Sequence, residues 1–184
     1  MKHSPIWHPF TQHAIIPESI LVKETEGAYY ITEKGKRIFD AISSWWVITH
    51  CHRHPAIMKA IKEQTEELDQ VIFAGFTHHP AEETAGKLLN LVQTSLNNKN
   101  LQHAFFSDSG STAVEVGVKM ALSYWRNLGE TRSQIVVLEH AYHGDTIGTM
   151  SLGMRGIFNA SYAPLLFEVL RLPFPKLENA DEML

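Results

Sequence analysis

The stretch SDSGSTAVEVGVKMALSYW, residues 107–125, decides the fold. Its first six residues are small, hydroxylated or acidic, and the apolar stripe of a helix follows them. Thr112 and Glu115 have the spacing of a capping box, so we expect a helix over residues 112–127. The N-terminus of a helix exposes unpaired N–H groups and about half a positive charge. This stretch therefore presents a polar, partly positive segment at the start of a long helix.

A phosphate group is the ligand that this segment suits. Gly110 lets the backbone approach a ligand closely, and Ser109, Ser111 and Thr112 offer hydroxyl donors. The alternative is an ordinary capped helix with a flexible lead-in. From this motif alone the alternative is favoured, because short Gly/Ser segments are common before helices.

The patterns along the rest of the chain predict an α/β fold. Three β-rich runs at 20–23, 28–32 and 37–42 are separated by short breaks, which predicts an antiparallel meander. Beyond about residue 50, helical patterns alternate with short buried runs, which favours a mainly parallel sheet. Helices are expected from Pro55 and from Pro80, because proline is well tolerated at the first helical position. Two short buried strands are expected as well, at residues 103–106 and 134–138.

A second polar loop, EHAYHGDTIG (139–148), follows the strand expected at 134–138. If the two buried strands are parallel, both polar loops lie at the carboxyl edge of the sheet, where open α/β sheets bind ligands. Tyr142 suits stacking on a flat ring, and His143 and Asp145 suit orienting that ring. Phosphate at one loop and an aromatic face at the other describe a phosphorylated heteroaromatic cofactor. The alternative is a surface turn that binds nothing.

The segment DAISSWWVITH (40–50) contains adjacent tryptophans, Trp45 and Trp46. In a strand, neighbouring side chains point to opposite faces, so one ring is expected in the core and the other at a pocket. Tryptophan is a usual wall for an apolar substrate chain. Both rings packed in the core is an equally good interpretation of the pattern.

Composition excludes several classes of function. The 184-residue chain carries a net charge of -4, which argues against a nucleic-acid or anionic-membrane surface. A single cysteine rules out an internal disulfide and a multi-cysteine metal site, and the histidines lack an HExxH arrangement. No apolar run approaches the roughly 20 residues of a membrane span, and the start has no secretory h-region. We therefore expect a soluble, cytoplasmic protein with no metal site.

Together these segments resemble the class III aminotransferases, which have the fold-type I fold of pyridoxal-phosphate enzymes. The resemblance runs in family order through IWHPFTQH (6–13), DAISSWWVITHCHRHPAI (40–57), GFTHHPA (75–81), FSDSGSTAVEVGVKMALSYW (106–125) and AYHGDTIGTMS (141–151). The motifs SSWW and IWHPFT are shared by fewer members of the class. They resemble the sequences of the members that convert 8-amino-7-oxononanoate into 7,8-diaminononanoate in biotin synthesis. Another class III ω-aminotransferase and a non-catalytic product remain alternatives.

The resemblance implies an incomplete fold-type I structure. Residues 1–50 match the N-terminal segment of the family's small domain, and residues 51–184 match the first part of its large cofactor-binding domain. The family's active site closes across a homodimer. We therefore expect this chain to be the amino-terminal part of such an enzyme.

The resemblance also implies roles for the polar loops. Gly110 and Ser111 are expected to bind the phosphate of pyridoxal 5'-phosphate. Tyr142 is expected to lie against the pyridine ring and to line the substrate pocket, with His143 beside the cofactor and Asp145 near the substrate.

Two further residues are expected at the substrate. Trp45 corresponds to the residue that contacts the aliphatic chain of 8-amino-7-oxononanoate. Phe10 stands where members that use S-adenosylmethionine usually carry a tyrosine, so it keeps the stacking surface and loses the hydroxyl. S-adenosylmethionine is the expected amino donor, and lysine is the alternative.

A transaminase also needs a lysine that forms a Schiff base with the cofactor and a carboxylate facing the pyridine nitrogen. None of the ten lysines follows a buried strand in the family's setting, since Lys119 lies in mid-helix and Lys176 near the C-terminus. Asp181 and Glu182 lack the strand that precedes the family's Asp motif. We therefore expect no catalytic residue in this chain, and no activity from it alone.

Overall fold

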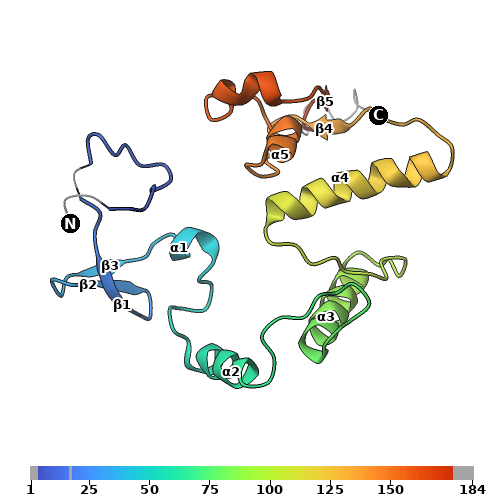
Figure 1. Cartoon of the computed structure of the whole chain (residues 1–184). Helices are drawn as coiled ribbons and strands as arrows, with labels where there is room; N and C mark the ends of the chain where they lie inside the picture. Colours follow the sequence, from blue (N-terminus) through green and yellow to red (C-terminus); the bar gives the residue numbers. More distant parts are fainter. Residues whose placement is uncertain (1–3, 17, 176–184) are drawn as a thin grey trace. The chain divides into compact units, whose positions relative to one another are not determined.

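The computed structural model describes residues 4–16 and 18–175. The chain divides into two compact units, Met1–His79 and Pro80–Leu184. Figure 1 shows the order of the helices and strands along the chain. Each unit carries its own candidate residues, so the two units are described one after the other.

The predicted boundary between residues 50 and 51 separates the small and large domains of the family, which differ from these two compact units. That boundary stays a prediction. Lys176, Asp181 and Glu182 lie outside the described residues, so the expectations for them also stay predictions.

A three-stranded antiparallel sheet organises the first unit. Its strands are β1 (Val22–Glu26), β2 (Tyr29–Thr32) and β3 (Arg37–Phe39), in the order β1-β2-β3. Tyr29 pairs with Phe39 across β2 and β3. The three strands lie side by side in Figure 1. The predicted meander is therefore confirmed.

A turn of left-handed backbone, α1 (Ser43–Trp46), follows the sheet. The φ angles of its four residues are 50°, 48°, 65° and 68°, none of them at glycine. The expectation that SSWW forms an extended strand is wrong, because positive φ coils the chain into a left-handed turn. Such a turn costs about 1–2 kcal/mol per L-residue, so contacts from other parts of the unit must stabilise it.

Two helices follow, α2 (Pro55–Thr65) and α3 (His79–Ser95). The first begins at Pro55 as predicted, and the second begins one residue before Pro80. Neither helix has a buried residue. Apolar side chains on both helices, such as Ile57 and Leu88, are therefore exposed within the described part of the chain.

The second unit continues with a long helix and a parallel strand pair. These elements are α4 (Gly110–Asn127), β4 (Val136–Leu138), α5 (Ile147–Leu152), the 3-10 helix η1 (Ala160–Leu165) and β5 (Leu170–Leu172). β4 and β5 pair in parallel register, with Val136 opposite Leu170. Parallel pairing beyond residue 50 is therefore confirmed, but its partner strand is β5, which the sequence patterns did not predict, and not the segment 103–106.

The strand expected at residues 103–106 is not formed. A β-strand is defined by hydrogen bonds to a neighbouring strand, and the described residues provide this segment with no such neighbour. Phe105 and Phe106 are accordingly 61% and 44% exposed. Its apolar sequence is typical of a buried strand, but apolar sequence alone does not supply a partner.

Few apolar side chains are buried in the described part of the chain. They are Val137 of β4 and Leu152 of α5, at 9% and 4% exposure. On either side of Val137, Val136 and Leu138 are 54% and 41% exposed. The strand pair therefore presents an apolar surface and two open edges, which favour pairing with another chain.

We expect the 184-residue protein to self-associate, because this surface is apolar and its edges carry unpaired backbone groups. Light scattering after size-exclusion chromatography measures the effect. The double variant V136K/L170E places opposite charges on cross-strand partners, so it keeps the pairing and should reduce association. A monodisperse wild-type monomer with a sharp cooperative melting transition would contradict the expectation.

Candidate functional site

The polar segment at residues 107–112 forms the N-terminus of α4. Ser109 is extended, with φ -155° and ψ 164°, and its Oγ accepts a hydrogen bond from the Thr112 N–H at 3.2 Å. The Thr112 hydroxyl oxygen in turn accepts from the Ser109 N–H at 3.1 Å. The capping box is thus Ser109 with Thr112, and the predicted box of Thr112 with Glu115 is wrong. The helix consequently begins at Gly110, two residues earlier than expected.

This cap determines which backbone groups face outward. The box uses the amides of Ser109 and Thr112, so the N–H groups of Gly110 and Ser111 are the first-turn donors that it leaves unused. Gly110 is exposed and Ser111 is half-buried. The start of an 18-residue helix with two such donors and several hydroxyls has the chemistry of an anion site.

The loop after β4 lies directly against this helix start. The Asp145 N–H donates a hydrogen bond to Ser111 Oγ at 3.1 Å, across 34 residues of sequence. Gly144 has a φ of +134°, and a Cβ on it would lie 2.1 Å from Ser111 Oγ. Glycine is therefore required here both by its backbone angle and by the close approach to Ser111. The two loops expected to share an edge do lie together.

Tyr142 presents an open aromatic face beside this junction. Its hydroxyl donates a hydrogen bond to Asp145 Oδ2 at 2.8 Å, and the residue is 74% exposed. This hydrogen bond raises the pKa of the Tyr142 hydroxyl above its ordinary value, and burial and the carboxylate charge add to the shift. The hydroxyl stays protonated at neutral pH, and Asp145 orients it. His143 lies between these residues and is half-buried.

Glu115 is a residue of this junction that sequence reasoning placed wrongly. Its Oε1 accepts hydrogen bonds from Thr146 Oγ1 at 2.5 Å and from the Gly148 N–H at 3.0 Å. Glu115 follows Ser111 by four positions, so both lie on the same face of α4. This spacing is the feature of the sequence that could have placed Glu115 against the second loop instead of in the helix cap.

The first unit brings the other two predicted residues together. Phe10 and Trp45 stack with ring centroids 5.3 Å apart and planes at 23°. They are 77% and 56% exposed, and Trp46 is 74% exposed. The expectation that one or both tryptophans lie in the core is therefore wrong for the described structure. Left-handed backbone turns both rings outward, where Trp45 and Phe10 form a flat apolar surface.

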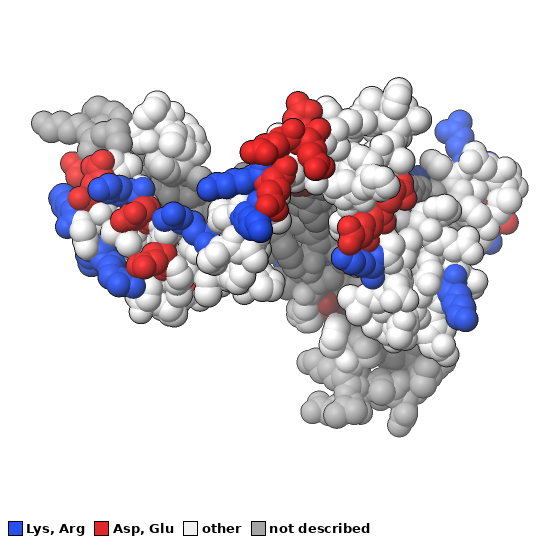
Figure 2. Space-filling model, turned by 90° about the horizontal axis from the view of Figure 1, so that it is seen from below, with Lys and Arg blue, Asp and Glu red and all other residues white. Residues whose placement is uncertain are grey.

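The charges of the described residues are mixed in sign. On the face shown in Figure 2, Lys and Arg side chains lie among Asp and Glu side chains. Within the described ranges, no three His, Cys, Asp or Glu side chains form a group suited to a metal ion. In those same ranges, no helix combines the length and the apolar character that crossing a membrane requires.

Comparison with known proteins identifies the family to which this chain is similar. The aminotransferase class-III family model matches residues 11–183. The chain is 46% identical over 181 residues to an adenosylmethionine-8-amino-7-oxononanoate aminotransferase of Synechococcus elongatus, covering 98% of this chain and 42% of that protein. It is 38% identical to the Geobacter sulfurreducens protein of the same name, covering 92% of this chain and 37% of that one. The chain thus spans about two fifths of the length of these relatives.

Solved structures agree with this assignment. An adenosylmethionine-8-amino-7-oxononanoate aminotransferase from Methanocaldococcus jannaschii superposes with a TM-score of 0.79 at 32% identity, covering 95% of this chain and 39% of that one. A PLP-bound amine transaminase from an uncultivated Pseudomonas species superposes with a TM-score of 0.81 at 27% identity, covering 94% and 39%.

Gly144→Ala should open the junction between the two loops. The new methyl group meets Ser111 Oγ, and the positive φ strains any L-residue by about 1–3 kcal/mol. We expect faster amide hydrogen exchange over residues 139–148, measured by mass spectrometry on the full-length protein. Gly156→Ala is the matched control, because its Cβ would meet only the end of Met154 at 3.9 Å. Unchanged exchange in Gly144→Ala would show that the close approach is not structurally important.

Proposed function

This chain belongs to the class III aminotransferase family, and on that premise we propose that it carries the cofactor-binding loops of an aminotransferase that converts 8-amino-7-oxononanoate into 7,8-diaminononanoate. The fold-type I fold expected from the resemblance is confirmed by the solved relatives. The observation that carries the proposal is the junction of Ser111 with Asp145, because it joins a phosphate-type helix N-terminus to an exposed aromatic face.

The residues present fit pyridoxal 5'-phosphate. Gly110 and Ser111 would hold the phosphate through the first-turn amides and the Ser111 hydroxyl, which could donate to the anion while it accepts from the Asp145 N–H. When bound, the cofactor supplies an electron sink that lets an amino group move between donor and acceptor. Tyr142 would lie against its ring, and His143 would lie beside it.

The acceptor is recognised by apolar contact and by one oriented hydroxyl. Trp45 and Phe10 provide a stacked surface that suits an aliphatic chain. Asp145 orients the Tyr142 hydroxyl by accepting its hydrogen bond, so this pair is suited to orienting the polar end of a substrate. These substrate-binding roles are the ones that the resemblance to the family implies.

S-adenosylmethionine is the amino donor that we propose, in line with the names of the relatives. Phe10 lacks the hydroxyl of a tyrosine, so a donor that needs this hydroxyl binds less well and lysine is the second candidate. We further propose that the protein works as a homodimer in the cytoplasm. No residue of this chain is proposed to bond covalently to the cofactor.

The full-length protein that carries this chain should turn over 8-amino-7-oxononanoate with S-adenosylmethionine in the presence of pyridoxal phosphate, as measured by product mass. Ser111→Ala should weaken cofactor affinity about ten- to a hundredfold, because one hydrogen bond to a charged phosphate is lost. Ser123→Ala, an exposed serine on the same helix, is the matched control. Turnover of other ω-amino acceptors but not of this one would favour another class III ω-aminotransferase.

The 184-residue chain alone should have no transaminase activity. Its lysines lack the setting that covalent attachment to the cofactor needs, although the phosphate-binding segment is present. A coupled assay on material purified from a host strain depleted of aminotransferases measures this. Sustained turnover by such a preparation would show that a lysine of this chain serves after all.

A further inference from the structure

The left-handed turn Ser43–Trp46 is the most strained segment that the structure describes. Four consecutive non-glycine residues have positive φ. Conformations of this kind persist only where the surroundings over-determine them, and they concentrate at functional sites. The contacts that hold this turn therefore indicate what it is for.

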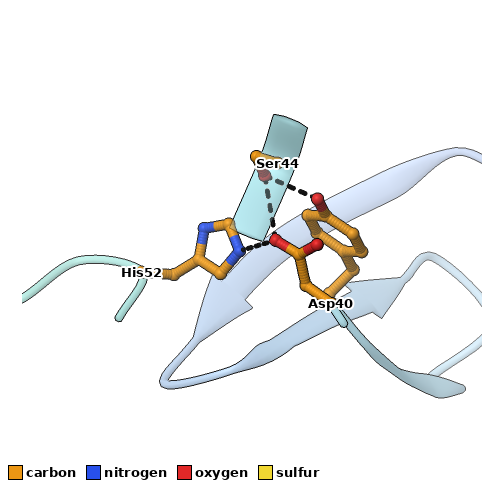
Figure 3. A network of polar contacts seen from close by, with 4 residues as sticks. Asp40, Ser44 and His52 are labelled. Atoms are coloured by element: carbon orange, nitrogen blue, oxygen red, sulfur yellow. Dashed lines mark hydrogen bonds and ion pairs between the residues drawn. The ribbon is translucent and has the colours of Figure 1, made fainter. Parts of the chain in front are cut away.

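A buried carboxylate holds the turn from below (Figure 3). Asp40 Oδ2 accepts a hydrogen bond from Ser44 Oγ at 3.0 Å and from His52 Nε2 at 2.8 Å. Ser44 Oγ also lies 2.5 Å from the Tyr30 hydroxyl. The side chains of Asp40 and His52 are only 2% and 8% exposed. Four polar side chains thus converge beneath the backbone of residue 44.

The sheet fixes this cluster in place. The Asp40 N–H donates to the Ala28 carbonyl at 2.9 Å, and the His52 N–H donates to the Gly27 carbonyl at 2.7 Å. The His52 ring also packs against the Tyr30 ring, with centroids 5.1 Å apart. The carboxylate is therefore positioned by the turn between β1 and β2, and Ser44 is positioned by the carboxylate.

Asp40 is ionised at neutral pH. Burial raises its pKa, but the surrounding donors Ser44, His52 and Tyr30 outweigh burial and hold the pKa below the ordinary range. Its other oxygen, Oδ1, is buried and has no hydrogen-bond partner among the described residues. The hydrogen bonds to Oδ2 support the turn, but an unpaired Oδ1 in a buried site costs free energy that an apolar side chain would avoid, so stability alone does not explain the arrangement.

The outward side of the turn is Trp45, which stacks on Phe10. We propose that Asp40 and His52 are positioning residues for the apolar surface of the substrate site, because they hold Ser44 left-handed and so set where the Trp45 ring lies. The inference rests on the proposed function in one respect, namely that the Trp45 ring touches the acceptor. On this inference, Asp40 and His52 affect how tightly the aliphatic chain of the acceptor binds and do not affect the reacting groups.

The test has one readout that is independent of the substrate. The full-length protein is labelled with 5-fluorotryptophan, and the 19F resonance of Trp45 is assigned as the one missing from Trp45→Phe. Phe10→Leu removes the stacked ring and calibrates its effect on that resonance. Asp40→Asn should move the Trp45 resonance toward the Phe10→Leu position, because a loosened turn separates the two rings.

The second readout is steady-state kinetics on the same proteins. Asp40→Asn should raise KM for 8-amino-7-oxononanoate about tenfold and leave kcat within about twofold, since binding contact is lost without a change in the reacting groups. Tyr30→Phe removes only the hydroxyl next to Ser44, so it should act in the same direction and still fold. Asp69→Asn is the matched control, because Asp69 is exposed and its Oδ1 accepts only from the neighbouring Gln70 N–H.

Each outcome decides the proposal. An unmoved Trp45 resonance in both Asp40→Asn and Tyr30→Phe overturns it, whatever the substrate. A moved resonance with an unchanged KM, in an enzyme that turns over this acceptor, also overturns it. If the wild-type protein fails to turn over the acceptor, the proposed function fails, and the 19F comparison alone supports or overturns the positioning of Trp45.

Discussion

The hydrogen bond from the Asp145 amide to the Ser111 hydroxyl joins two segments that lie 34 residues apart. Gly144 permits it, because any larger residue at that position would collide with Ser111. Glu115 reinforces it one helical turn later, through Thr146 and the Gly148 amide. These contacts hold the start of α4 and the aromatic face of Tyr142 in one fixed arrangement. The binding of a phosphorylated ring that we propose depends on that arrangement more than on any single side chain.

The first unit positions its aromatic surface with a strained backbone turn, whereas the second unit positions its polar loops by close packing. Its left-handed turn costs conformational energy at each of four residues, and a buried carboxylate offsets that cost through Ser44. The Trp45 ring consequently faces outward against Phe10 instead of entering a core. This unit thus obtains an exposed apolar surface from a left-handed turn that side-chain hydrogen bonds support.

Sequence patterns predicted those features that depend on local spacing. The antiparallel meander, the helix start at Pro55 and the meeting of the two polar loops all follow from turn residues, helix caps and alternation. The left-handed turn at Ser44 does not, because its conformation depends on Asp40 and on His52, which is eight residues after Ser44. The segment 103–106 fails as a strand for a similar reason, since pairing depends on a backbone neighbour elsewhere. The roles of Trp45 and Phe10 came from the family resemblance rather than from spacing.

We propose above all that the N-terminus of α4 binds the cofactor phosphate. The most direct measurement is a crystal structure of the full-length protein with pyridoxal phosphate. We expect phosphate oxygens at hydrogen-bond distance, about 2.7–3.2 Å, from the amides of Gly110 and Ser111, with Tyr142 against the ring. A phosphate bound elsewhere, with those amides contacting only water, would contradict the account.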